Sequence, residues 1–190
     1  MRNVLLAAAL IVAPAAALAD DLSYTYADVR YFTTDADDLS INQQGGVLAG
    51  SYAIDSTFFV AGDASFGYSD AFNNGHYKTV TAALRGGAHY PVTDVLDVVG
   101  SAGMLFADVS GNGAKENDFG YRADAGLRLA LAPQVEIGAF YSYQSIFSND
   151  TSTFTGDLQY HVTENISAVA SITNGRNADI YSIGARYRFE

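Results

Sequence analysis

Arginines and carboxylates that recur two positions apart are the residues of this sequence best suited to build a polar site. Asp28 and Arg30 form one such pair, and Arg122 and Asp124 form another. Successive side chains of a β-strand point to opposite faces, so residues two apart lie on the same face. Opposite charges on one face neutralise each other through charge-assisted hydrogen bonds. The spacing therefore predicts a network of ion pairs along one face of a sheet.

His76 and Asp70 are the residues closest to a catalytic pair, and they fall in one connecting segment. An enzyme would also need a nucleophile or an activated water beside the base, and no serine or paired-aspartate motif accompanies them. The stretch TDADDLSIN, residues 34–42, resembles the start of a calcium loop. It lacks the required glycine and glutamate of that loop. We therefore predict no catalytic residue, no metal site and no cofactor.

The composition is that of an acidic chain rich in β-strands. It has 21 Asp and Glu residues against 10 Lys and Arg, a net charge of −11, so we expect no nucleic-acid partner. It contains 13 tyrosines and 11 phenylalanines but only 3 prolines, a composition that favours strands. Cysteine is absent, which excludes disulfides and thiolate metal sites.

The first 19 residues have the form of a signal peptide. Arg2 precedes an apolar run over residues 4–13, and Ala17-Leu18-Ala19 is a small-x-small cleavage pattern. The apolar run is too short to span a bilayer as a helix. We therefore predict an exported protein with a signal peptide at residues 1–19 and one mature domain at residues 20–190.

Ten segments of alternating apolar and polar residues follow, separated by turn residues. They run over 22–33, 44–54, 57–68, 78–90, 95–107, 119–131, 135–145, 153–162, 166–173 and 181–190. Their connections alternate between short and long, which is the layout of an outer-membrane barrel. The predicted fold class is all-β: a closed antiparallel up-and-down transmembrane β-barrel with ten strands, or with eight if short segments merge.

The distribution of charge indicates which face of this sheet meets lipid. The polar face carries Asp28, Arg30, Asp63, Arg85, Asp97, Arg122, Asp124, Arg128, Glu136, Asp157, Arg186 and Arg188. The opposite face of the second to tenth segments carries only Lys78, whose stem can extend to water. Aromatic residues gather at both ends of the apolar face, as at two membrane–water interfaces. We expect lipid outside, and inside a lumen charge network that plugs the barrel.

The last strand carries a more specific pattern. Residues 182–189, SIGARYRF, resemble the C-terminal β-signal of Gram-negative outer-membrane proteins, although Glu190 adds one residue after the final aromatic. The resemblance implies that Gly184, Tyr187 and Phe189 form an assembly signal for the barrel-assembly machinery. The whole chain resembles small outer-membrane β-barrels of the OmpA/OmpX type and their porin-like relatives. This implies a location in the cell outer membrane, with outer-membrane lipids and lipopolysaccharide as neighbours, and we expect a monomer.

Three functions fit these features. The first is an integral barrel with a structural or surface-interaction role, a plugged lumen and acidic extracellular loops. The second is a narrow porin or small-solute channel, which would conduct ions when reconstituted. The third is an outer-membrane lipid hydrolase or protease, which would lose activity when His76 or Asp70 is substituted. The missing catalytic motif favours the first two, and we predict that the protein is not an enzyme.

Overall fold

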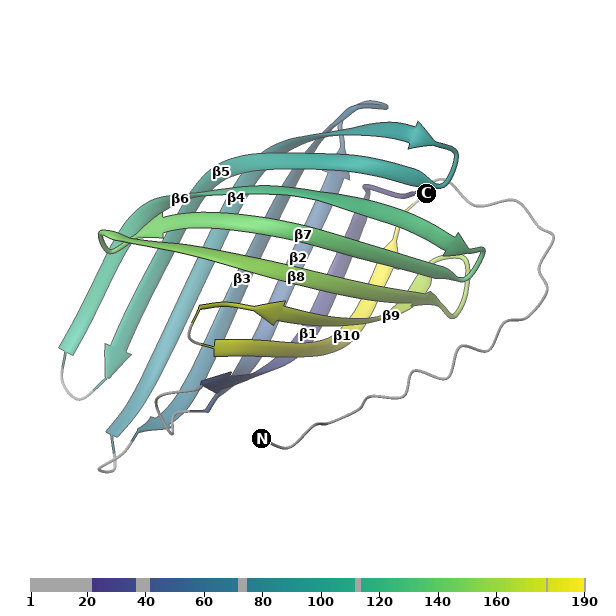
Figure 1. Ribbon diagram of the computed structural model, residues 1–190. Helices are drawn as coiled ribbons and strands as arrows, with labels where there is room; N and C mark the ends of the chain where they lie inside the picture. The colour runs from purple at the N-terminus through teal and green to yellow at the C-terminus, as the bar shows by residue number, and fades with distance from the viewer. Residues whose placement is uncertain (1–21, 37–41, 72–74, 112–113, 177, 190) are drawn as a thin grey trace.

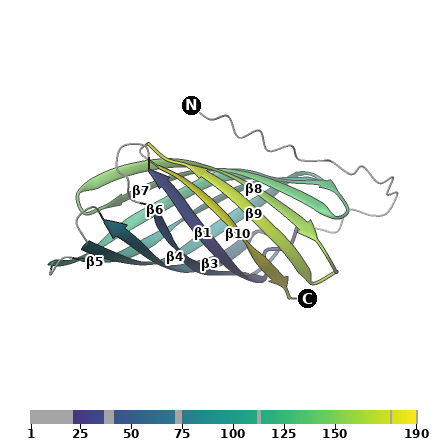
Figure 2. The same ribbon diagram turned by 90° about the horizontal axis from the view of Figure 1, so that it is seen from below.

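The computed structural model describes residues 22–36, 42–71, 75–111, 114–176 and 178–189, and these form a closed antiparallel β-barrel (Figures 1 and 2). Each strand pairs with its neighbours in sequence, and β1 pairs with β10 to close the barrel. The strands are β1 Tyr26–Ala36, β2 Gln43–Ala53, β3 Phe58–Ala71, β4 Gly75–Thr93, β5 Leu96–Gly111, β6 Ala114–Ala132, β7 Val135–Ile146, β8 Asn149–His161, β9 Ile166–Asn174 and β10 Ala178–Arg188. The prediction of ten strands is confirmed, and the alternative of eight is wrong.

Several strands run further than the alternation of the sequence predicts. β4 and β6 have 19 residues each and β5 has 16, whereas a tilted strand crosses the bilayer in about 9–11. Residues 69–77, 108–118 and 146–152 were predicted as long loops, and most of them belong to strands. Hairpin pairing continues there, as between Asp108 and Asn117. Neither face is buried in lipid beyond the membrane, so the apolar alternation is lost although the strands continue.

The turns at the two rims differ in their backbone chemistry. Between β2 and β3, the Asp55 carboxylate accepts hydrogen bonds from the N–H groups of Thr57 at 2.7 Å and Phe58 at 2.8 Å. The N–H groups of Phe58 and Thr57 hold the pKa of this carboxyl below its usual value. Between β7 and β8, Phe147 and Ser148 adopt φ values of 53° and 57°. Positive φ at both central residues is the geometry of a type I′ hairpin turn.

The outer surface of the barrel is apolar and the inner surface is polar. Large apolar side chains stand exposed on the outside, as Leu84 does at 68% and Met104 at 65%. Buried side chains inside include Asp28, Asp97 and Arg128. The inversion of the usual apolar core is what a bilayer around the barrel requires. Among the described residues, no helix is long and apolar enough to cross a membrane.

Inward-facing aromatic rings are accommodated by glycines on the neighbouring strand. Phe59 of β3 lies directly opposite Gly87 of β4, and the nearest atoms to a Cβ added at Gly87 would all belong to the Phe59 ring. Phe140 of β7 lies opposite Gly126 of β6 in the same way, and its ring and the neighbouring backbone crowd that position. Each ring therefore lies flat along the barrel wall in space that any other residue at the glycine would fill.

Candidate functional site in the barrel lumen

The charged residues of the inward face gather in three clusters, and the first of them lies beside the short turns. Nε of Arg128 donates to Oε1 of Glu136 at 2.6 Å, and both residues are buried. Nη1 of Arg128 donates to the backbone carbonyl of Ser23 at 3.1 Å. The guanidinium therefore joins the barrel wall to the segment that precedes β1.

Tyr24 lies inside this mouth of the barrel and completes the first cluster. Its hydroxyl donates to Oδ2 of Asp97 at 2.8 Å, and Nδ1 of His89 lies 3.0 Å from the same oxygen. Its ring stacks on His89 with centroids 3.8 Å apart and on Phe59 at 5.2 Å. The Arg128 guanidinium lies 4.4 Å from the ring centroid. Burial raises the pKa of Tyr24 against the opposing effect of Arg128, so the hydroxyl keeps its proton and acts as the donor.

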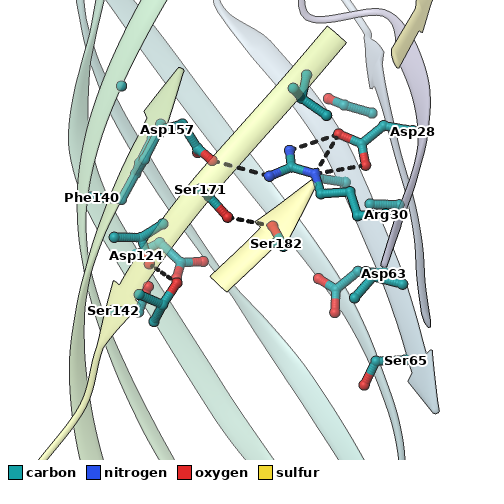
Figure 3. Close-up of a pocket in the computed structure, with 18 of the residues that line it drawn as sticks. Asp28, Arg30, Asp63, Ser65, Asp124, Phe140, Ser142, Asp157, Ser171 and Ser182 are labelled. Carbon is teal, nitrogen blue, oxygen red and sulfur yellow. Dashed lines mark hydrogen bonds and ion pairs between the residues drawn. The ribbon is translucent and has the colours of Figure 1, made fainter. Parts of the chain in front are cut away.

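The second cluster is built around Asp28, whose side chain is fully buried between two arginines. Nη2 of Arg30 lies 2.7 Å from Oδ2 of Asp28, and Nη2 of Arg186 lies 2.8 Å from the same oxygen. Nη1 of Arg30 reaches Oδ1 of Asp157 on β8 at 3.0 Å (Figure 3). Nη1 of Arg186 donates to Oε1 of Gln159 on β8 at 2.9 Å. Two arginines from β1 and β10 thus reach past β9 to the wall formed by β8.

The third cluster joins β3, β4 and β6. Arg85 lies between two carboxylates, with Nη2 at 2.5 Å from Oδ1 of Asp63 and Nη1 at 2.6 Å from Oδ2 of Asp124. Nε of Arg122 lies 2.8 Å from Oδ1 of Asp124, and the Ser101 hydroxyl donates to Oδ2 of Asp124 at 3.1 Å. Asp63 and Asp124 face the same space as the second cluster (Figure 3). In both the second and the third cluster, two arginines balance two carboxylates.

The predicted network residues are thus distributed over distinct sites. Eleven of the twelve contribute to the three clusters, and Arg188 lies at the short-turn rim, where Nη2 donates to the carbonyl of Glu164 at 2.5 Å. Nδ1 of His161 on β8 lies 2.8 Å from the Ser167 hydroxyl on β9. On the outer surface, Nδ1 of His76 lies 2.5 Å from the Tyr68 hydroxyl. Three predicted features lie outside the described part of the chain. They are the signal peptide within residues 1–21, residues 37–41 of the acidic stretch, and the side chain of Asp70.

A cavity of about 630 Å³ occupies the lumen, and the second and third clusters form part of its wall. Its wall also carries hydroxyl groups that bond to each other between strands. Ser65 and Thr81 are 2.7 Å apart, Thr155 and Thr173 are 2.8 Å apart, and Ser171 and Ser182 are 2.6 Å apart (Figure 3). The lumen therefore combines neutralised charge with neutral polar groups.

Sequence reasoning missed Tyr24 and Tyr26 as lumen residues. Tyr24 precedes β1, and its segment lacks the clean alternation that assigned faces elsewhere. Tyr26 does lie at an inward position, and the Arg186 guanidinium stands 3.7 Å from its ring centroid. A tyrosine two residues before Asp28 on the charged face was the available signal, because residues two apart share a face.

One family model and several solved structures match this chain over most of its length. A family model described as the outer membrane protein β-barrel domain matches residues 4–189. The KdgM porin in complex with disordered oligogalacturonate is 18% identical, with a TM-score of 0.47 over 87% of this chain and 99% of that chain. Ail, the attachment invasion locus protein of Yersinia pestis, is 16% identical, with a TM-score of 0.43 over 88% of this chain and 100% of that chain. OprG from Pseudomonas aeruginosa is 11% identical, with a TM-score of 0.49 over 92% of this chain and 100% of that chain. A search of curated proteins found no match.

Proposed function

Because the chain belongs to the outer membrane protein β-barrel family, and so resides in the outer membrane, we propose that it is an integral barrel with a structural or surface-interaction role whose lumen is plugged. The plug consists of the charge network together with Tyr24. The observation that carries this proposal is the first cluster, in which Tyr24, Arg128 and Asp97 occupy the mouth beside the short turns.

The second and third clusters support the same conclusion because their arginines are held on more than one side. Arg30 bonds to both Asp28 and Asp157, and Arg85 bonds to both Asp63 and Asp124. Each of these arginines could swing aside for a passing ion only by breaking its ion pairs with two carboxylates at once. Breaking a buried ion pair costs about 3–5 kcal/mol. Thermal motion therefore opens this path rarely.

Single-channel recording from planar bilayers tests the proposal. We expect no steady channels from the wild-type barrel, and a new conductance when Tyr24→Ala is combined with Arg30→Ala and Arg85→Ala, which removes the ring from the mouth and one arginine from each of the other two clusters. Tyr52→Ala is the matched control, because Tyr52 is 64% exposed on the outer face and its loss leaves the lumen unchanged. Steady conductance in the wild type would contradict the plugged lumen.

A narrow porin or small-solute channel is the second candidate, and the cavity of about 630 Å³ favours it. Balanced charge and hydroxyl groups such as those of Ser65 and Thr155 suit a small polar solute better than a free ion. Uptake of a neutral sugar into vesicles that contain the wild-type barrel would support this candidate. Equal sugar uptake by vesicles with and without the barrel would exclude the channel function.

We further propose that the protein is not an enzyme. His76, the residue nearest to a general base in the third hypothesis, bonds to the Tyr68 hydroxyl on the outer face. Esterase and protease assays on the reconstituted barrel should give the same background rate for the wild type and His76→Ala. A rate that falls with this substitution would revive the hydrolase hypothesis.

We also propose that Gly184, Tyr187 and Phe189 form an assembly signal and that the barrel is a monomer. Tyr187 and Phe189 are exposed on the outer face near the short turns, with ring centroids 5.0 Å apart. Gly184 on the inner face is crowded by the Val29 carbonyl and by the backbone and side chain of Arg30 on β1. Phe189→Ala should slow insertion by the barrel-assembly machinery, while Phe58→Ala, at the same rim but outside the signal, should insert at the wild-type rate.

A further inference from the structure

The barrel wall separates the two lysines of the chain from the arginines of the described strands. Lys78 and Lys115 are the only lysines in the sequence. Both are exposed on the outer face, on β4 and β6. The arginines of the described strands all lie at inward positions of their strands. The lysines are therefore the permanent cations that the described strands present outside the barrel.

The two lysines lie in one row across neighbouring strands. Lys78 pairs with Ser110 of β5, and Ser110 pairs with Lys115 of β6. Neighbouring strands lie about 4.8 Å apart, so the two lysine Cα atoms are separated by roughly 10 Å. Two flexible stems at this spacing can bring both ammonium groups to one doubly charged anion, or to two neighbouring ones.

The row lies where the outer face changes from apolar to polar. The rings of Phe106 and Phe119 pack there at a tilt of 50°, with centroids 5.0 Å apart, and aromatic rings mark the membrane interface. Beyond them toward the strand ends, the outward positions are Asp108, Ser110 and Lys115. The ammonium groups therefore lie at the level of lipid headgroups, on the side of the longer hairpins that faces the cell exterior in such barrels.

The wall of the barrel opposite the lysine row carries negative charge at the same rim. Asp35 of β1 and Asp179 of β10 are direct neighbours on the outer face at the same rim, and the whole chain carries a net charge of −11. Such a surface repels anions. In the lysine row, Asp108 bonds to Lys115 at 3.0 Å, which leaves one net positive charge and further ammonium donors.

We propose that Lys78 and Lys115 form a binding site for the phosphate groups of a phosphorylated glycolipid in the outer leaflet. The phosphates lie between the two ammonium groups, and the acyl chains lie along the apolar wall that ends at Phe106 and Phe119. A lipid is the source of the phosphate because this apolar wall continues directly below the row. The inference needs only the membrane location and is independent of whether the lumen conducts.

Native mass spectrometry of the full barrel in detergent, titrated with bisphosphorylated lipid A, tests the site. Each lysine near an anionic surface strengthens binding about fivefold, so Lys78→Gln with Lys115→Gln should weaken retention roughly 25-fold. Replacement of both by arginine should preserve binding. Asp108→Asn should strengthen it, because Lys115 loses its competing carboxylate. Arg176→Gln removes a positive charge from the β9–β10 loop at the same rim and should have no effect.

Two further arms distinguish the source of the phosphate. Lipid A without its phosphates should bind the wild type as weakly as the double glutamine variant binds the phosphorylated lipid. Inorganic pyrophosphate at equal concentration should not displace the lipid. Unchanged retention in the folded double glutamine variant, or an equal loss in Arg176→Gln, would overturn the proposal. Displacement by pyrophosphate would overturn the assignment to a lipid.

Discussion

Replacement of Asp28 by asparagine tests whether the lumen ion pairs are shielded from water well enough to stabilise the folded barrel. The side chain of Asp28 is 0% exposed, and those of Arg30 and Arg186 are 15% and 10% exposed. The asparagine side chain would place an amide donor or an uncharged oxygen against two guanidinium groups. Breaking a buried pair by removing one partner costs about 3–5 kcal/mol. Because both arginines keep other acceptors, we expect a loss near the lower limit, about 3 kcal/mol.

The assay is equilibrium unfolding by urea in phospholipid vesicles. The folded fraction can be followed by far-UV circular dichroism and by the mobility of unheated samples on gels, since the chain has no tryptophan. Asp108→Asn is the matched control, because its partner Lys115 is 66% exposed and exposed pairs contribute about 0–1 kcal/mol. A double substitution of Asp28 and Arg186 should cost less than the sum of the single ones, because the two share one interaction.

The result that refutes this reasoning is a loss below about 1 kcal/mol for Asp28→Asn, equal to that of the exposed control. Water in the lumen would then solvate the charges as well as their partners do. The argument that the arginines cannot swing aside would fail with it, and the plugged lumen would lose its energetic basis.

Three smaller effects follow from the packing and the turns. Gly87→Ala should destabilise the barrel by about 1–3 kcal/mol through overpacking against a phenylalanine ring. Gly86→Ala should be neutral in the same urea titration, because nothing lies within 4 Å of the new methyl group. Ser148→Gly should stabilise it by about 1 kcal/mol, because the residue has φ of 57°. The lowered pKa of Asp55 means that its turn is stabilised above the usual carboxyl pKa and loses that support as the pH falls through the lowered value. The protection of the turn amides from hydrogen exchange, taken relative to the intrinsic exchange rate at each pH, should fall with acid in the wild type but not in Asp55→Ala.

The sequence predicted the faces of the strands well because a bilayer leaves little freedom. Every outward position of a spanning strand has to be apolar, so Arg122 and Asp124 could only share the lumen. Their spacing also predicted their contact, since they are two residues apart on one strand. The same reasoning applies to Asp28 and Arg30. Local spacing was therefore sufficient for pairs within a strand.

Contacts across the lumen could not be predicted in the same way. Arg30 and Asp157 lie 127 residues apart, and whether they meet depends on the tilt and stagger of all the strands between them. Tyr24 falls in the first predicted segment, but that segment lacks clean alternation and β1 begins only at Tyr26, so the pattern did not assign Tyr24 to the mouth. The extension of β4 to β6 beyond the bilayer was missed because lipid no longer imposes a pattern there. In each case the deciding constraint comes from the closed barrel and not from neighbouring residues.

The division of cations between the two faces follows from the chemistry of their side chains and leads to a last prediction. Arginine carries a planar fork that bonds to two carboxylates at once, as Arg30 does with Asp28 and Asp157. Lysine is a single charge on a flexible stem, which suits a mobile headgroup. Arg30→Lys should therefore destabilise the barrel by about 2 kcal/mol, because one ammonium cannot reach both carboxylates with the same geometry. The reverse exchange at Lys78 should leave stability unchanged in the same urea titration. Equal stability of Arg30→Lys and the wild type would mean that charge alone, without the fork, sustains the network.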